Sequence, residues 1–248
     1  MASSKSSSAT FLETVIVILE ALFIALAIRT FLYQPFNIPS GSMKANLLIG
    51  DYLFVNKFAY GYSKHSFPFS IPLFEGRAWS TPPVRGDVIV FKTPRDNATD
   101  YIKRLIGLPG DHIQMKHSVL YINGQEVKRE RVDDFEGEDA FDQPVMIPQF
   151  RETLPNGVTY NTLDMTQNGS LDDTQEYIVP EGHYFFMGDN RDNSSDSRVL
   201  NDVGYVPEIN LLGRAEVIFF SVNEGQPAWM FWNWPWTVRW NRLFHTIH

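Results

Sequence analysis

Cysteine is absent from this chain of 248 residues. Its absence excludes disulfide bonds, thiol catalysis and metal sites built from thiolates. Positive charge is also scarce: the chain has 21 lysines and arginines but 29 aspartates and glutamates, which leaves a formal net charge of −8. General binding to nucleic acid requires a basic surface, so we expect no nucleic-acid partner.

The acidic residues are concentrated in one segment. Twelve of them lie between Glu130 and Glu176, where only Arg131 and Arg151 oppose them, so this segment carries a net charge of −10. The spacing of a calcium-binding loop is missing. We therefore interpret residues 130–176 as a solvated acidic excursion rather than a cation site.

One long apolar run is present, FLETVIVILEALFIALAIRTFLY, at residues 11–33. About 20 helical residues cross a hydrocarbon core of about 30 Å, so we expect a transmembrane anchor here. A cleaved secretory signal is the alternative, since Ala25-Leu26-Ala27 provides a small-x-small site. The retained anchor is favoured because Lys5 is the one basic side chain before the run and because Glu20 interrupts it.

The flanks of the anchor suggest its orientation. Lys5 and the serines around it favour a short cytoplasmic leader at residues 1–10. Residues 34–248 would then form an extracytoplasmic domain. We expect this domain to be mostly β and antiparallel, because 15 prolines and 16 glycines spread through the chain suit many short strands.

Several strands of that domain are predicted from local patterns. Gly-Asp turns precede two of them, at 51–58 and 86–92, and Asn123-Gly124 is a strong two-residue hairpin signal within residues 119–127. Later strands are expected at 182–190 and 213–222. No long helical period follows the anchor.

Two aromatic stretches interrupt the strand pattern. Residues 61–83 are rich in proline and aromatics, and we expect a loop or extended arm. The tail at 229–248 holds five of the six tryptophans, together with Arg239 and Arg242. Such a tail suits a membrane–water interface, but its rings could equally pack on the domain's own core.

Three further stretches could carry chemistry. IPSGSMKANL, at 38–47, reads by itself as a turn. If the stretch DYIKRLIGLPGD at 100–111 opens as a strand, Lys103 would share a face with Tyr101 and Leu105, and an amine on such a face is partly desolvated. A lysine that serves as a base needs a pKa of about 7–8, a cost of about 4 kcal/mol. The polar stretch 188–198 offers hydroxyls and charges to such an amine.

Other hydrolytic arrangements are disfavoured. The six histidines lie in loops, hairpins or the tail without a partner pattern, so a Ser-His-Asp triad is not indicated. A metal hydrolase is disfavoured because no cluster of ligands is visible.

Five sequence blocks in order, PSGSM, GDYLFVNKFAYG, GDVIVFK, DYIKRLIGLPGD and GDNRDNSSDSR, resemble the bacterial type I signal peptidase family. The resemblance covers residues 34–128 and 180–221. It implies a membrane-anchored Ser-Lys endopeptidase that removes signal peptides from exported preproteins after small-x-small sites, without metal or cofactor. It also implies a single-pass protein of the bacterial inner membrane, with a smaller β-rich segment inserted at 112–183 and with membrane lipid as a second partner.

The resemblance assigns roles to single positions. Ser42 is the nucleophile, and Lys103 is its general base. The Ser42 N–H and the Ser40 hydroxyl donate to the oxyanion, and Ser194 orients the lysine amine. The expected bracing charges are Arg104, Asp189, Asp196 and Arg198. The residues expected to line the pockets for substrate positions −1 and −3 are Phe36, Ile38, Met43, Leu47, Tyr101 and Ile102.

The chain departs from the family pattern at Ala45-Asn46, where proline and threonine are common. Two other functions remain open from sequence. One is a related Ser-Lys protease with a different target, such as a self-cleaving repressor or a pilin processor. The other is a membrane-anchored β domain that binds partners without catalysis. Loss of activity in Ser42→Ala or Lys103→Ala would exclude this binding role.

Overall fold

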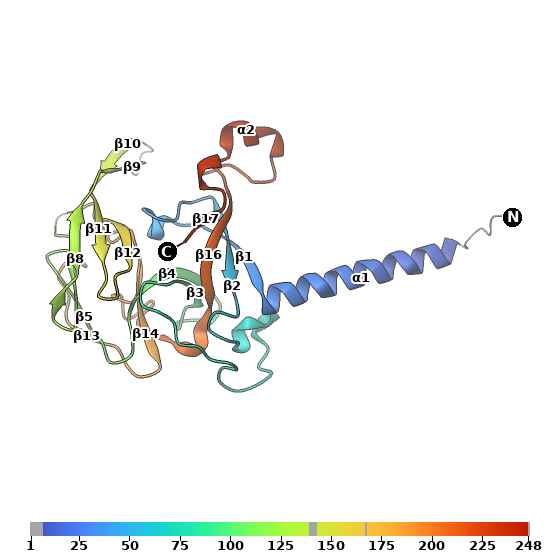
Figure 1. Cartoon of the computed structure of the whole chain (residues 1–248), viewed down its shortest axis with the longest axis horizontal. Helices are drawn as coiled ribbons and strands as arrows, with labels where there is room; N and C mark the ends of the chain where they lie inside the picture. The colour runs from blue at the N-terminus through green and yellow to red at the C-terminus, as the bar shows by residue number, and fades with distance from the viewer. Residues whose placement is uncertain (1–6, 139–142, 167, 248) are drawn as a thin grey trace.

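The computed structural model describes residues 7–138, 143–166 and 168–247. It shows a body of antiparallel sheets from which one long N-terminal helix projects (Figure 1). The mostly β fold expected from the sequence is confirmed. Residues 1–6 of the expected leader lie outside the described residues, as do Asp139 and Asp142 of the acidic segment.

Helix α1 (Ser7–Phe31) contains the apolar run, and residues 11–31 are long and apolar enough to cross a membrane. It ends two residues before the boundary expected from sequence. The Leu32 N–H still bonds to the Ile28 carbonyl, but Tyr33 already begins the first strand. The side chains of the span are almost all exposed, as expected for a helix that packs against lipid rather than protein.

The main sheet carries Lys103 and flanks the stretch that holds Ser42. Within the described residues it has eight strands in the order β1-β2-β16-β3-β4-β14-β15, with β17 pairing on β16. Their bounds are β1 (Tyr33–Asn37), β2 (Asp51–Asn56), β3 (Val88–Lys92), β4 (Asp100–Gly107), β14 (His183–Met187), β15 (Val206–Pro207), β16 (Leu211–Ser221) and β17 (His245–Thr246).

Three Gly-Asp turns share one construction. Each glycine has a positive φ, +89° at Gly50, +99° at Gly86 and +84° at Gly110. The aspartate that follows accepts a hydrogen bond from the N–H three residues earlier, at 2.7 to 3.0 Å. Glycine is the residue that tolerates this φ, and the carboxylate closes the turn, so each pair starts a strand or its approach at a defined point.

Residues 112–178 form three smaller sheets beside the main one. The hairpin at Asn123-Gly124 is confirmed, with φ of +53° and +76° at its two turn residues. The strands are β5 (His112–Lys116), β6 (Val119–Ile122), β7 (Gln125–Glu126), β8 (Lys128–Arg131), β9 (Phe135–Glu138), β10 (Pro144–Ile147), β11 (Gln149–Thr153), β12 (Thr159–Leu163) and β13 (Tyr177–Ile178). The subdomain boundaries 112–183 stay a prediction.

The acidic segment is not wholly solvated, so that interpretation is wrong in part. Glu152, Asp164 and Asp172 are buried. Arg191 pairs with Glu152, and Arg129 pairs with Asp164, so arginines compensate two of the three charges. Partners that lie far along the sequence are invisible to a local count of charges.

The two aromatic stretches form loops with short helical turns: η2 (Lys64–Ser66) and η3 (Pro68–Ser70) in the arm, then η5 (Phe231–Asn233), α2 (Trp234–Thr237) and η6 (Trp240–Arg242) in the tail. Two more short helices lie elsewhere, η1 (Gly41–Met43) and η4 (Glu208–Asn210). Four tail tryptophans are exposed, while Trp234 packs on Phe220 with ring centroids 4.9 Å apart. The tail arginines face the domain instead: Arg242 pairs with Asp51 at 2.6 Å.

Candidate active site

Two buried side chains meet at the start of the domain. Ser42 lies in η1, just after β1, and Lys103 lies in the middle of β4. Lys103 is 4% exposed, and its Nζ is 2.7 Å from the Ser42 Oγ and 3.1 Å from the Ile102 carbonyl oxygen. The sequence-predicted nucleophile and base are thus in hydrogen-bond contact, although 61 residues separate them.

The setting of Lys103 favours its neutral form. Burial lowers the pKa of the Lys103 amine to about 8, and the carboxylates of Asp196 and Asp189 oppose the shift only in part. A neutral amine at hydrogen-bond distance from a hydroxyl is the arrangement in which a lysine can accept a proton from serine.

A groove of about 400 Å³ opens over this pair. Its walls come from the stretch Pro39–Ser42, from the start of β4, and from Asn193 and Ser195. Ser40 is exposed and lines the groove with Ser42, so the two residues expected to supply the oxyanion donors border the same space. Tyr101 and Ile102 line it as well.

The residues expected to contact substrate gather in one place. Five of the six belong to one apolar cluster of the main sheet: Ile38, Met43 and Leu47 are buried in it, and Phe36 and Ile102 pack against it. Tyr101 instead packs against the neighbouring cluster, where its ring centroid is 6.3 Å from that of Phe91.

The four bracing charges form two buried ion pairs. Arg104 donates to both carboxylate oxygens of Asp189 at 2.8 Å, and Arg198 donates to both of Asp196 at 2.9 Å. Burial alone would raise the pKa of Asp196, but Arg198 together with the Gly188 N–H outweighs it, so the net effect is a lowered pKa. Such two-bond pairs fix geometry as well as charge. Arg104 follows Lys103 directly on β4, and the other three charges belong to the 188–198 stretch.

Ser194 lies close to the Ser42 loop, and the residue between them is a glycine, Gly188. A Cβ added at Gly188 would lie 2.2 Å from the Ser194 Oγ and 2.6 Å from the Ser42 carbonyl oxygen. The absence of a side chain at Gly188 therefore lets these groups approach. In the described residues, the Lys103 amine bonds to Ser42 and to Ile102 but not to Ser194.

Sequence reasoning missed two asparagines that hold the nucleophile loop. Asn190 donates to the carbonyls of Ser42 and Gly41 at 3.0 and 3.1 Å. Asn46 donates to Asp189 at 2.7 Å. The departure from the family pattern at Ala45-Asn46 agrees with this structure. Asn46 supplies the bond to Asp189, and Ala45 has a φ of +105°, which proline could not adopt.

A third buried ion pair also went unpredicted. Arg191 donates to both carboxylate oxygens of Glu152, at 2.7 and 2.6 Å, and Tyr160 donates to the same carboxylate at 2.8 Å. The Tyr160 ring lies under the Arg104 guanidinium, 4.1 Å from centroid to Cζ. The acidic segment therefore contacts the bracing charges directly. Arg191 lies in the GDNRDNSSDSR block of the sequence, but nothing in the sequence points to Glu152 as its partner.

The signal peptidase family, peptidase S26, matches residues 11–220. The chain belongs to this family. It is 47% identical over 206 residues to signal peptidase I of Rickettsia typhi, covering 80% of this chain and 76% of that protein. It is 43% identical over 242 residues to signal peptidase I of Rickettsia conorii, covering 91% and 89%. The crystal structure of signal peptidase I from Enterococcus faecalis matches 54% of this chain and 97% of its own, at 28% identity and a TM-score of 0.32.

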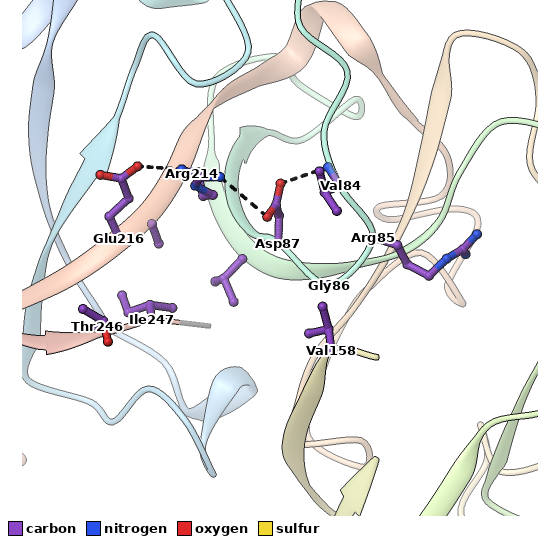
Figure 2. Close-up of a pocket in the computed structure, with 11 residues that line it drawn as sticks. Val84, Arg85, Gly86, Asp87, Val158, Arg214, Glu216, Thr246 and Ile247 are labelled. Carbon is purple, nitrogen blue, oxygen red and sulfur yellow. Dashed lines mark hydrogen bonds and ion pairs between the residues drawn. The ribbon is translucent and has the colours of Figure 1, made fainter. Parts of the chain in front are cut away.

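A second cavity lies apart from the signal peptidase groove. It measures about 500 Å³ and lies between the start of β3, Val158 and the C-terminal residues (Figure 2). Its charges are already paired: Arg214 bridges Asp87 and Glu216, as the dashed lines in Figure 2 show. Among the described residues that line it, none belongs to the predicted site, so we assign it no catalytic role.

One acidic cluster has the geometry to hold a metal. Carboxylate oxygens of Asp164, Asp172 and Asp192 lie within 4.8 Å of one another. Burial, with the neighbouring acids, raises the pKa of Asp164, and Arg129 opposes this shift by pairing with it. The chain thus supplies a cation to this cluster itself, and we do not assign a metal there.

Proposed function

We propose that Ser42 and Lys103 are the nucleophile and general base of this signal peptidase, which cleaves signal peptides from exported preproteins. The single observation that carries the assignment is the 2.7 Å contact between the Ser42 Oγ and the amine of buried Lys103. Neither group would be reactive alone, because serine is a weak nucleophile and an exposed lysine is a cation.

In acylation, the Ser42 Oγ attacks the carbonyl carbon of substrate residue −1 while the Lys103 amine takes the hydroxyl proton. The tetrahedral oxyanion accepts hydrogen bonds from the Ser42 N–H and the Ser40 hydroxyl. The intermediate then collapses as the Lys103 ammonium gives its proton to the leaving amine. The mature protein departs with a new amino terminus, and the signal peptide remains esterified to Ser42.

In deacylation, Lys103 is neutral again and takes a proton from water. The resulting hydroxide attacks the ester carbonyl, and the same two donors stabilise the second oxyanion. The proton returns from Lys103 to the Ser42 oxygen as the ester bond breaks. The pairs Arg104–Asp189 and Asp196–Arg198 hold the surrounding loops in place through both steps, and Ser194 would orient the lysine amine only after a small movement toward it.

The substrate side chains at −1 and −3 would enter the apolar surface of the cluster around Ile38, Met43 and Leu47, with Phe36, Tyr101 and Ile102 at its edge. The three central side chains are almost fully buried, so they would form the floor beneath the pockets, and the partly exposed residues would form the walls. An extended peptide could bind by strand addition to the edge strand β1.

We further propose that the domain rests on the membrane from the extracytoplasmic side of the inner membrane. The arm beside α1 and the tail around α2 both lie toward the side from which α1 leaves the body (Figure 1). Phe69, Trp79 and Trp236 are each more than three-quarters exposed there, as interfacial aromatics are. Their position supports lipid contact rather than packing on the core.

The assignment is tested by cleavage of a preprotein with a small-x-small site, using purified full-length protein in detergent. We expect processing after residue −1 by the wild type, and a loss of at least about 1000-fold in kcat for Ser42→Ala and for Lys103→Met. Thermal unfolding of each variant checks that the fold is retained.

Retained activity in both folded variants would refute the Ser-Lys pair. If the folded wild type cleaves none of several preproteins, a related protease with a dedicated target, or a binding role without catalysis, becomes the better reading.

A further inference from the structure

A cavity of about 470 Å³ lies between the end of α1 and the active-site groove. We call it the anchor cavity. Its lining includes Arg29, Gln34, His65, Lys92 and Asp100. Asp100 lines both this cavity and the groove that holds Ser42, so the two spaces adjoin.

Cations predominate around the anchor cavity. Arg29 and Lys92 line it, and the buried Lys57 reaches its wall through the Gln34 side-chain oxygen at 3.2 Å. Asp100 is the one carboxylate among the described lining residues, and Lys92 already pairs with it at 2.8 Å. Within the described part of the chain, Arg29 and Lys57 have no acidic side chain within ion-pair distance.

The pKa values of two buried side chains at the anchor cavity, His65 and Lys57, are lowered by burial and by nearby cations. Burial and neighbouring cations lower the pKa of His65 to about 4, so its ring is neutral at pH 7. Its Nδ1 contacts the Ser70 hydroxyl at 3.0 Å, while its buried Nε2 has no partner in the described residues. Burial lowers the pKa of Lys57 to about 8; Asp100 opposes this shift, and Arg29 and Lys92 add to it.

A signal peptide that runs from the groove toward the membrane end of α1 would pass this cavity, because the two spaces adjoin at Asp100. Its −1 residue lies at Ser42, and its apolar core lies in the membrane beside α1, so the segment between them runs from the groove toward the anchor. Strands rise about 3.3 Å per residue. Gln34 lines the cavity and precedes Ile38 by four residues, which is about 13 Å along an extended chain. A substrate strand that runs alongside β1 with its residue −2 beside Ile38 would therefore place residue −6 beside Gln34.

We propose that the anchor cavity is a substrate subsite that receives the residues around −6 of the signal peptide and discriminates against a cationic side chain there. The inference rests on the proposed function, because it takes the Ser42 groove as the position of residue −1. A glutamate at −6 would face Arg29 and Lys57. A lysine would face the same two cations, with the nearest carboxylate already paired.

The test uses three preproteins that differ only in Gln, Glu or Lys at −6. They are cleaved by full-length protein in a nonionic detergent without phospholipid, and kcat/KM is measured for each. For the wild type we expect the Glu substrate to exceed the Lys substrate by about tenfold. The ratio should shrink as ionic strength rises. Arg29→Gln and Lys57→Met should each move it toward one.

Lys116→Gln is the matched control, because Lys116 is an exposed cation on β5, in the inserted segment. It should leave the ratio unchanged. Arg29 is exposed, so its variant keeps the test valid even if the buried Lys57 variant fails to fold.

Three outcomes separate the possibilities. Equal kcat/KM for the three substrates, or a ratio that both folded variants preserve, would overturn the subsite. Variants that alter only stimulation by phosphatidylglycerol vesicles, with the ratio intact, would make the cavity a lipid site and refute the proposal. No cleavage of the Gln substrate by folded wild type would instead count against the proposed function itself.

Discussion

Lys103 is held where a charged amine is costly. Its pKa falls from 10.5 to about 8 on burial, which corresponds to about 3 kcal/mol of folding free energy at neutral pH. Between these two pKa values the unfolded chain binds more protons than the folded one. The stability of the fold therefore rises with pH across this window, as the unfavourable charge is lost.

The same shift sets the pH dependence of activity. Below about pH 8 the Lys103 amine of the free enzyme is protonated and cannot act as a base. We expect kcat/KM to rise by about tenfold per pH unit up to about pH 8 and then to level off. Cleavage rates from about pH 5.5 to about pH 10, with thermal unfolding at each pH, measure this. A flat profile through pH 7 to pH 9 would contradict it.

Gly188 is a second residue on which the site depends. A methyl group there would overlap the Ser194 Oγ and the Ser42 carbonyl, so one of them must move. We expect Gly188→Ala to lower kcat by on the order of 100-fold with little change in KM, because displacement of about 1 Å at reacting groups has that effect.

Gly137→Ala is the matched control for this substitution. The one contact under 3 Å that its Cβ would make is with Cδ1, the flexible end of the Ile147 side chain. This variant should keep kcat. Equal activity of the two folded variants would mean that the close approach at Gly188 does not matter.

At the scale of elements, the sequence predicts turns and hairpins correctly where the backbone preference of one or two residues determines them. The Gly-Asp turns and the Asn123-Gly124 hairpin were predictable because a positive φ favours glycine or asparagine whatever surrounds it. The place of Glu152 was not, because its partner Arg191 lies 39 residues away and joins it only through folding. The contact of Ser42 with Lys103 came from the family resemblance, since spacing alone could not supply it.

The β11–β12 hairpin acts as a support for the catalytic loops. Leu163 of β12 exchanges backbone hydrogen bonds with Asp189 and Arg191, at 2.8 and 2.9 Å. The Glu152 carboxylate of β11 accepts hydrogen bonds from the Arg191 guanidinium. A segment that the sequence offered only as acidic surface thus holds the stretch that carries Asp189.

Glu152→Gln tests this support. It leaves the buried Arg191 without its counter-charge, so we expect the free energy of unfolding to fall by about 3 kcal/mol and kcat to fall more than KM rises. Chemical unfolding and steady-state kinetics measure the two effects. Glu136→Gln, an exposed acid on β9, should change neither. Full stability and activity in Glu152→Gln would show that the hairpin is not needed.

The whole molecule combines one helix long and apolar enough to cross a membrane with an arm and a tail that lie toward the side from which this helix leaves the body (Figure 1). In the proposed orientation, protease added to bacterial spheroplasts should digest the β domain, whereas inside-out membrane vesicles should protect it. A cytoplasmic marker must show the opposite pattern. Protection in spheroplasts with digestion in inverted vesicles would reverse the orientation.

Arg242 holds Asp51 and the Asn46 carbonyl, close behind the nucleophile loop, across about 190 residues of chain. During synthesis, Ser42 and Lys103 leave the ribosome long before this clamp exists. A nascent chain therefore carries both reactive groups without the Arg242 contacts that fix the Ser42 loop. Activity should begin only after Arg242 has been synthesised and has paired with Asp51, which delays cleavage by the unfinished chain, including cleavage of its own anchor.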